Sequence, residues 1–362
     1  MFDWTIIALI FIFVTKLFNN NYLQAKFVPM HKSIVLCDDI SSDYLQKIES
    51  FLEEWESESA NIAVYTSGST GEPKQILLNK KNVRASANAT GKFFKFRKGH
   101  TLLLNLSPDY IAGKLMLVRA LEHEMRIVVA PVSQNPLLSI GNEKIDFAAF
   151  VPYQVEAILS DDKTKVKYES ITAVIIGGAP VSAKVESKLM NLKNRSYATF
   201  GMTETITHVA LRNISQADQF YTCLPGITIE QDDRDCLVIN ENEISNRLVT
   251  NDLIAKIDTN KFQWHGRIDN IVNSAGIKIF PEKIEKNIAD LIANNRFYLI
   301  GQKSEVFGEE LVLYVEGVQP PNWDTTVVEM NQRLTTYERP KKVVFVSRFI
   351  ETSSGKVKRI NL

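Results

Sequence analysis

The stretch Tyr65-Thr66-Ser67-Gly68-Ser69-Thr70-Gly71-Glu72-Pro73-Lys74 decides the fold, because small hydroxylated residues and glycines here separate two apolar runs. The apolar runs cover residues 61–64 and 75–78, so we predict a strand, a loop and a second strand. Gly68 and Gly71 can adopt positive φ and let the backbone come close to a ligand. Successive N–H groups in such a turn form a concave site for an anion, most often phosphate.

A turn of this composition is also common as a plain polar hairpin, and the residues alone leave that alternative open. The stretch is not a Walker-type P-loop, because Gly71 is followed by Glu-Pro-Lys rather than by Lys and Ser or Thr. It resembles the phosphate loop of the adenylate-forming acyl-CoA synthetase (AMP-binding) superfamily, [ST]-S-G-[ST]-T-G-x-P-K. The resemblance implies that ATP is bound by Thr66, Ser67, Gly68, Ser69, Thr70, Gly71 and Lys74.

The composition is that of a folded intracellular protein. A length of 362 residues suggests about two domains, and 45% hydrophobic residues supply ample core. Lys and Arg together equal Asp and Glu at 42 each, so the charge balance calls for neither nucleic acid nor an anionic membrane as partner. The three cysteines, Cys37, Cys223 and Cys236, show no CxxC spacing, so we expect a reduced, cytoplasmic protein without a zinc site.

The N-terminal extension, residues 1–29, has a role that the residues leave open. Residues 4–14 form an apolar run that is shorter than the ~20 residues of a transmembrane helix. The run could be the apolar part of a signal peptide, although Asp3 rather than a basic residue precedes it. It could also be a short helix in contact with a membrane, or a translated upstream stretch with Met30 as the working start. We favour the last interpretation.

Short apolar strands that alternate with helices predict a layered α/β domain whose strands are buried on both faces. We assign residues 30–268 to an N-terminal ATP- and acid-binding domain, in which residues 228–264 form a small β-rich subdomain. Residues 269–362 are expected to form a small mobile α+β lid domain. The predicted helices are 41–58, 80–94, 112–121, 153–159, 181–192, 281–293 and 325–334. The predicted strands outside the β-rich part are 101–106, 126–130, 147–151, 173–176, 197–200, 296–300, 311–315 and 342–346, with a hairpin at 270–279.

Two further turns resemble nucleotide-binding motifs of the superfamily. The turn at Gly177, Gly178 and Ala179 follows an apolar run, and in the superfamily such a turn lies flat against the adenine. Residues 199–204 resemble the Y-G-x-T-E motif. The resemblance implies that Phe200 and Gly201 contact the adenine, that Thr203 offers its hydroxyl to the α-phosphate, and that Glu204 binds Mg²⁺. Read alone, the first turn is equally a plain βα turn and the second a capped helix start.

The later motifs resemble the ribose, hinge, thiol-tunnel and C-terminal segments of the superfamily in the same order. Asp252 would accept hydrogen bonds from the ribose hydroxyls, although Asn251 stands where the superfamily has Gly. The other assignments that the resemblance implies are the ATP contact Arg267, the hinge Asp269, the CoA-tunnel residues Gly276 and Lys278, and the catalytic Lys356, with Thr203 and Glu204 as further catalytic residues. Taken singly, such residues are more often surface charges or part of a flexible basic tail.

The acid site is expected around a helix that carries an arginine. Residues 104–121 resemble the corresponding region of the 2-succinylbenzoate–CoA ligases of menaquinone biosynthesis, with Tyr110 where that group often has His. Arg119 is either a partner for a second carboxylate or a surface charge. Thr207 and His208 follow Glu204 closely and are expected to line the acid site.

The resemblance implies an acid–thiol ligase that uses ATP, Mg²⁺ and CoA. Such an enzyme forms an acyl-adenylate from a small carboxylic acid, here 2-succinylbenzoate, and transfers the acyl group to CoA. The alternatives that stay open are another aryl- or acyl-CoA ligase, a stand-alone adenylation enzyme that loads a carrier protein, and a non-catalytic nucleotide or acyl binder. The oligomeric state and any contact of residues 4–14 with a membrane are likewise open.

Overall fold

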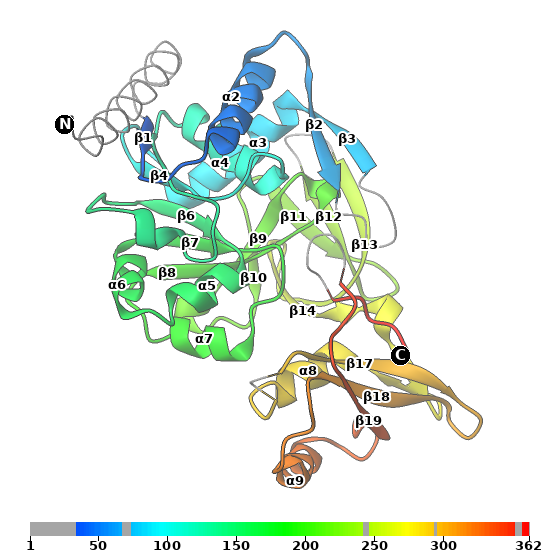
Figure 1. Cartoon of the computed structure of the whole chain (residues 1–362). Coiled ribbons are helices and arrows are strands. Elements are labelled where there is room, and N and C mark those ends of the chain that lie inside the picture. Colours follow the sequence, from blue (N-terminus) through cyan, green and yellow to red (C-terminus); the bar gives the residue numbers. More distant parts are fainter. Residues whose placement is uncertain (1–33, 67–73, 242–245, 293–294, 352–356, 362) are drawn as a thin grey trace, which may run out of the picture.

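A computed structural model describes residues 34–66, 74–241, 246–292, 295–351 and 357–361 of the chain. The N-terminal extension therefore lies outside the described residues. Within them, the largest unit is a sheet of twelve strands in the order β1-β5-β4-β6-β7-β8-β9-β10-β14-β13-β12-β11. Figure 1 shows this sheet running from the blue and green part of the chain into the yellow-green part.

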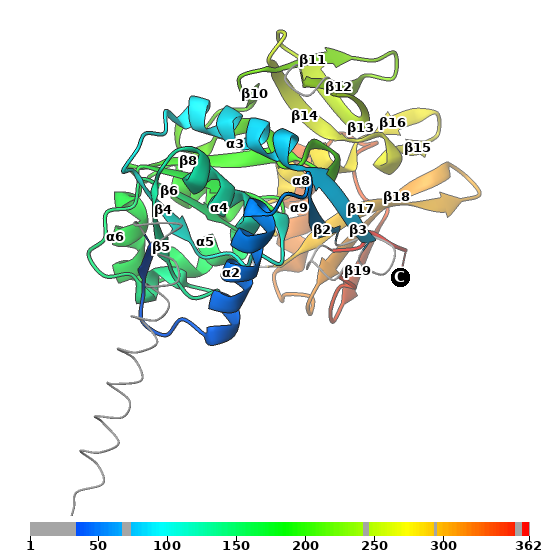
Figure 2. The same cartoon turned by 90° about the horizontal axis from the view of Figure 1, so that it is seen from above.

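The first half of the sheet is parallel and layered between helices, as the sequence predicts. Its strands are β1 (Ile34–Leu36), β4 (Thr101–Leu104), β5 (Arg126–Val129), β6 (Phe147–Phe150), β7 (Ala173–Ile176) and β8 (Arg195–Gly201). The helices α2 (Ser42–Glu56), α3 (Lys80–Phe94) and α4 (Ile111–Glu122) lie on one face (Figure 2). The other face is covered by α5 (Pro152–Ile158), α6 (Asp162–Ser170) and α7 (Ala183–Leu189).

Side-chain alternation along the strands explains the two cores. Leu102 and Leu104 of β4 enter the core under α2, α3 and α4, whereas Leu103 enters the core under α5, α6 and α7. All three leucines are fully buried. A parallel strand that is apolar at every position can be stable only between two such layers, so the uninterrupted apolar runs predict this architecture.

The second half of the sheet is antiparallel. It consists of β9 (His208–Asn213), β10 (Tyr221–Cys223), β11 (Ile227–Gln231), β12 (Cys236–Glu241), β13 (Asn246–Lys256) and β14 (Lys261–Arg267). The predicted β-rich segment is thus a continuation of the large sheet through β8, β9 and β10. Short 3₁₀ turns lie at η1 (Pro136–Ser139), η2 (Thr203–Thr205), η3 (Ile214–Gln216) and η4 (Ile268–Asn270). The predicted strands 247–249 and 254–257 are one strand, because β13 continues past an irregularity between Leu253 and Ile254.

The C-terminal segment has its own sheet and core. Its strands are β15 (Val272–Ser274), β16 (Ile277–Ile279), β17 (Phe297–Ser304), β18 (Gly308–Glu316) and β19 (Lys342–Val346), and its helices are α8 (Pro281–Ile288) and α9 (Trp323–Arg333). Ile284, Leu313 and Trp323 are buried in a cluster that contains residues of this segment only. The α+β prediction is therefore confirmed. Among the described helices, none is long and apolar enough to cross a membrane.

Four helices and strands, β1, β9, β10 and α6, were missed by the sequence interpretation. β1 and β10 are only three residues long, and β9 pairs with its sequence neighbours β8 and β10, whereas β10 also pairs with the more distant β14. α6 buries only Thr164 and Tyr168, so its sequence shows no apolar period. Asp161 caps α6 through a hydrogen bond to the Thr164 amide at 2.9 Å, which is a start signal that a polar stretch hides.

Candidate functional site

The phosphate-loop segment connects the two strands of a hairpin, as predicted. β2 (Asn61–Thr66) and β3 (Lys74–Asn79) are antiparallel, and Thr66 pairs with Lys74. The predicted ligands Ser67, Gly68, Ser69, Thr70 and Gly71 lie outside the described residues, as do the side chains of Thr66 and Lys74. The pairing nevertheless places Thr66 and Lys74 together at one end of the hairpin.

The predicted adenine turn has a backbone that only glycine accommodates well. Gly178 has a φ of +86°, and a Cβ at Gly177 would overlap the hydroxyl of Thr199. Thr199 donates a hydrogen bond of 3.2 Å to the carbonyl of Ile176, which ties β8 to the end of β7. Gly178 and Ala179 are exposed. An exposed turn at the carboxyl end of a parallel strand is where open α/β sheets bind their ligands.

The Phe200–Glu204 segment follows at the end of the next strand. The Phe200 ring packs edge to face against Tyr221 and Phe262, with centroid distances of 5.6 and 5.2 Å. Gly201 passes so close to β9 that a Cβ would overlap the carbonyl of Thr207. The side chain of Thr203 lies outside the described residues, and Glu204 is exposed in η2.

Glu204 has the chemistry that a nucleotide-bound magnesium ion needs. Across the described residues, no group of three or more His, Cys, Asp and Glu side chains is arranged to hold a metal ion by itself. Magnesium in phosphate-transfer sites is bound by one or two carboxylates, and the nucleotide phosphates and water supply the remaining oxygens. A single exposed carboxylate beside the nucleotide motifs fits this requirement.

The predicted ribose and hinge residues form one cluster. Asp252 is 6% exposed and accepts a hydrogen bond of 2.9 Å from the Trp264 indole. Burial raises the pKa of Asp252 above its usual range. Arg267 lies 3.8 Å from Asp252 and donates a 2.7 Å hydrogen bond to Asp269, whose pKa is lowered by that contact. The Asn251 amide also donates to Asp269, at 3.1 Å.

Asn251 therefore has a role that the sequence interpretation missed. Asn251 stands where the superfamily has Gly, and its side-chain amide joins β13 to the predicted hinge residue Asp269. Trp264 was also missed, although its indole occupies one oxygen of Asp252. A carboxylate oxygen has two lone pairs, so the same oxygen can still accept a hydrogen bond from a ribose hydroxyl.

The predicted tunnel segment is a tight turn between β15 and β16. Ala275 has a φ of +50° and Gly276 a φ of +81°, which are the values of a two-residue hairpin turn. A Cβ at Gly276 meets nothing within 4 Å, and Lys278 is exposed. Ala275 bears a left-handed backbone that costs about 1–2 kcal/mol more for Ala than for Gly.

Lys356 lies outside the described residues, but the residues on both sides of it are anchored. Glu351 and Val357 form an antiparallel bridge across the loop. Arg359 donates two hydrogen bonds, of 2.6 and 2.7 Å, to Glu285 of α8. The Tyr298 hydroxyl donates to the Ile360 carbonyl at 2.8 Å. The described residues on both sides of Lys356 are therefore held by the C-terminal segment.

The predicted acid-site residues Arg119, Thr207 and His208 lie together. Arg119 is 2% exposed, so the surface-charge alternative is wrong. It donates a 3.3 Å hydrogen bond to the Thr207 hydroxyl, and burial lowers its pKa to about 9. Within the described residues it has no carboxylate partner, and its Nε has no hydrogen-bond partner. Burial and the charge of Arg119 hold the pKa of His208 well below its usual value.

Tyr110 does not join this cluster. It is 59% exposed at the N-terminus of α4, and Arg119 follows nine residues later, about 14 Å along the helix axis. Thr90 of α3 takes its place in the cluster, with its hydroxyl 3.4 Å from His208 Nε2. The sequence interpretation did not identify Thr90, because an isolated threonine within a helix carries no pattern.

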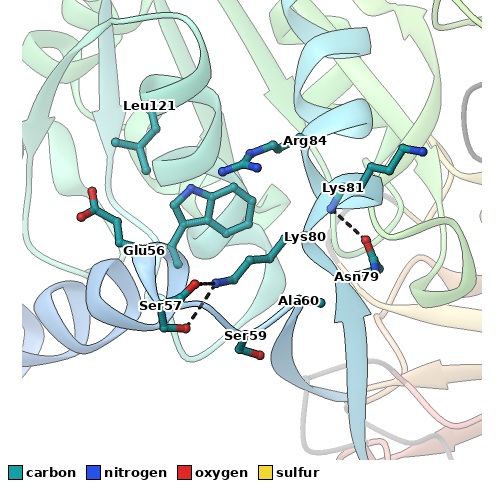
Figure 3. A pocket seen from close by; sticks show the side chains of 10 residues that line it. Glu56, Ser57, Ser59, Ala60, Asn79, Lys80, Lys81, Arg84 and Leu121 are labelled. Atoms are coloured by element: carbon teal, nitrogen blue, oxygen red, sulfur yellow. Dashed lines mark hydrogen bonds between the residues drawn. The ribbon is translucent and has the colours of Figure 1, made fainter.

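Two cavities differ in their relation to this cluster. A narrow one, of about 20 Å³, lies beside His208 between α3 and the start of β11. The larger one, of about 680 Å³, lies at the base of the β2–β3 hairpin, far from the loop end (Figure 3). Two of its lining cations have partners, because Lys80 donates to Ser57 and Arg84 pairs with Glu122 at 3.0 Å. The larger cavity is therefore separate from the candidate site.

Comparisons with known proteins show what this chain is similar to. Residues 21–235 match the family described as AMP-binding enzyme. The chain is 23% identical over 369 residues to a 2-succinylbenzoate–CoA ligase of Lactococcus lactis, covering 91% of this chain and 79% of that protein. It is 22% identical over 345 residues to the 2-succinylbenzoate–CoA ligase of Listeria monocytogenes, covering 89% and 73%.

Two solved structures are informative. An acyl-CoA synthetase (AMP-forming)/AMP-acid ligase II-like protein of Dyadobacter fermentans is 34% identical with a TM-score of 0.62, over 88% of this chain and 93% of that one. The o-succinylbenzoate CoA synthetase of Bacillus subtilis, in complex with the acyl-adenylate intermediate OSB-AMP, is 17% identical with a TM-score of 0.70 over 90% and 77%. The second likeness concerns the fold.

Proposed function

Because this chain belongs to the AMP-binding enzyme family, we propose that it is an AMP-forming acid–thiol ligase whose acid is the dicarboxylate 2-succinylbenzoate. The observation that carries the choice of acid is the buried guanidinium of Arg119, which has no carboxylate partner among the described residues. A buried cation is strongly unfavourable unless an anion pairs with it. A substrate with a second carboxylate supplies that anion. The two similar proteins from Lactococcus lactis and Listeria monocytogenes are named 2-succinylbenzoate–CoA ligases.

The proposed first half-reaction joins the acid to AMP. The acid's carboxylate oxygen attacks the α-phosphorus of ATP, and pyrophosphate leaves. The protein's contribution is to align two anions and to reduce their repulsion. We assign the phosphates to the 66–74 loop, the ribose to Asp252 and Arg267, and the α-phosphate to Thr203 and Lys356. Magnesium bound at Glu204 would neutralise phosphate charge.

The proposed second half-reaction transfers the acyl group to the thiol of CoA and releases AMP. We assign residues 269–362 to a lid that turns about Asp269 and brings Gly276 and Lys278 to the site in place of Lys356. The contacts of Asp269 with Arg267 and Asn251 support this assignment, since they join the two domains through side chains that can separate. The cytoplasm holds ATP, CoA and reduced cysteines, and we propose that the enzyme works there.

We propose that the acid enters beside His208 and widens the cavity there. The cavity beside His208 has room for about one water molecule, whereas an aromatic dicarboxylate is many times larger. Ser86 and Ala89 of α3 form one wall, and Leu224 and Gly226 near β11 form the other. Binding therefore requires that these walls separate, so we expect the acid to change hydrogen exchange at residues 224–227.

Product analysis tests the proposal directly. Purified protein is mixed with Mg-ATP, CoA and 2-succinylbenzoate, and the products are identified by mass spectrometry. Parallel reactions contain benzoate or a fatty acid. We expect 2-succinylbenzoyl-CoA and AMP from the dicarboxylate and neither product from the control acids. A thioester formed only from a control acid would assign a different acyl-CoA ligase activity. An adenylate without any thioester would favour transfer to a carrier protein.

A further inference from the structure

Thr90 is a buried threonine in the middle of α3 that none of the ATP or acid motifs includes. Its side chain is 0% exposed. Its hydroxyl donates a 3.2 Å hydrogen bond to the carbonyl of Ser86, one turn earlier, and lies 3.4 Å from His208 Nε2. Threonine is a poor helix former, and such a backbone contact slightly weakens a helix. The contact with His208 gives a reason for its presence.

The hydrogen bonds around His208 form one continuous chain. Arg119 Nη2 contacts the Thr207 hydroxyl at 3.3 Å, and that hydroxyl contacts His208 Nδ1 at 3.3 Å. On the other side of the ring, Nε2 contacts Thr90, and Thr90 contacts the Ser86 carbonyl. The chain thus connects α4, β9 and α3 through side chains that are buried or half-buried.

The two ends of the chain favour one arrangement of its protons. A guanidinium can only donate, and a carbonyl oxygen can only accept. The Thr90 hydroxyl has one proton, and its contact with the Ser86 carbonyl favours donation there, which leaves its oxygen to accept from a protonated His208 Nε2. His208 is neutral, because burial and the Arg119 charge lower its pKa, so Nδ1 has no proton. Nδ1 then accepts from the Thr207 hydroxyl, whose oxygen accepts from Arg119.

We propose that Thr90 is a positioning residue for the acid site, which acts by holding His208 as the Nε2–H tautomer. In that tautomer His208 Nδ1 accepts the proton of the Thr207 hydroxyl. A lone pair of the Thr207 oxygen is then free to accept the hydrogen bond from the Arg119 guanidinium. If Thr90 could not accept, the buried Nε2–H would lose its partner, and the proton would move to Nδ1. Thr207 would then receive donors from both neighbours, and Arg119 would be held less firmly. The expected effect of Thr90 on acid binding rests on the proposed function, whereas the predicted tautomer of His208 does not depend on it.

The test compares Thr90→Val, which keeps the shape and removes the hydroxyl, with Thr90→Ser, which keeps the hydroxyl. Nitrogen-15 NMR of histidine-labelled protein reads the tautomer, and the His208 signals are assigned by their absence in His208→Gln. We expect Nε2–H in the wild type and in Thr90→Ser, and Nδ1–H in Thr90→Val. We also expect Thr90→Val to raise KM for 2-succinylbenzoate about tenfold, the value of one hydrogen bond, without changing KM for ATP.

Several results would overturn the inference. An Nδ1–H tautomer or a doubly protonated ring in the wild type would show that the chain is not oriented as derived. Equal spectra for the wild type and Thr90→Val would remove the role of Thr90. An unchanged KM for the acid beside a changed tautomer would confine Thr90 to a structural role. If the wild type does not use 2-succinylbenzoate, the proposed function fails, and the spectra still decide the tautomer.

Discussion

Replacement of Arg119 by methionine should make the protein more stable and a much poorer ligase for a dicarboxylic acid. Burial lowers the pKa of Arg119 to about 9, so the charged form has lost several kcal/mol of solvation, on the order expected for a buried cation. The contacts with Thr207 and the Met116 sulfur return only part of this cost. Methionine has a similar length and no charge, so we expect unfolding to require about 1–3 kcal/mol more free energy.

The same change removes the proposed partner of the second carboxylate. Truncation of one member of a buried charge pair costs about 2–5 kcal/mol of binding energy, or roughly 30- to several-thousand-fold in kcat/KM. The matched control substrate is 3-benzoylpropionate, which lacks the ring carboxylate of 2-succinylbenzoate. Its kcat/KM should fall less than threefold, because it makes no use of the Arg119 charge. Arg119→Lys keeps the charge without the planar fork and should lie between the two.

Stability is measured by urea unfolding at pH 7.5, and activity is followed by AMP release with both acids. A variant that is less stable than the wild type would refute the statement that the Arg119 charge is held at a cost in the free protein. Equal losses of kcat/KM with both acids would show that Arg119 supports the site as a whole and does not bind the second carboxylate. Either result would remove the main support for a dicarboxylic substrate.

Three further predictions concern the neighbouring residues. Gly201→Ala should destabilise the protein by about 1–3 kcal/mol, because the new Cβ would overlap the Thr207 carbonyl, whereas Gly141→Ala, with nothing within 4 Å, should change urea unfolding by less than ~0.5 kcal/mol. The pKa of His208 is lowered in the folded protein, so as the pH falls below about 6.5 the unfolded chain binds a proton at His208 before the folded chain does. The free energy of unfolding should therefore decline there by up to ~1.4 kcal/mol per pH unit more in the wild type than in His208→Gln. Parallel pH profiles of the two proteins would contradict this. Lys356→Ala should slow adenylate formation ~10²–10³-fold in pyrophosphate-release assays yet leave thioester formation from supplied adenylate intact, and equal loss of both steps would exclude the lid exchange.

The sequence interpretation was most accurate where local pattern and tertiary packing demand the same residues. The helix at 80–94 and the strands at 173–176 and 342–346 coincide with α3, β7 and β19. α6 was missed because it buries one side of a mostly polar helix, and β13 was divided in two because its polar residues 250–252 resemble a turn. Tyr168 of α6 contacts Ser196 and Asn194, which no local window contains, whereas β13 is held by its sequence neighbours β12 and β14.

The candidate site shows the same division. Gly177 and Gly178 were identified from their order after an apolar run, and the structure supplies the physical reason, which is a positive φ and the closeness of Thr199. Asn251 was noted only as a departure from a motif, yet its amide joins β13 to Asp269. Thr90 and Trp264 carried no signal, since their importance comes entirely from which polar atom lies beside them.

The sequence by itself determined the layered α/β architecture, the order of the nucleotide motifs and the membership in one family, because apolar periodicity and glycine-dependent turns are local properties of the chain. Only the tertiary structure decided whether Arg119 is a surface charge or a buried cation, and which of the expected acid-site residues meet. A charged residue in a sequence does not show whether water or other side chains will surround it. The free energy of a guanidinium depends on the water and anions around it, and the packing of α3, α4 and β9 excludes that water.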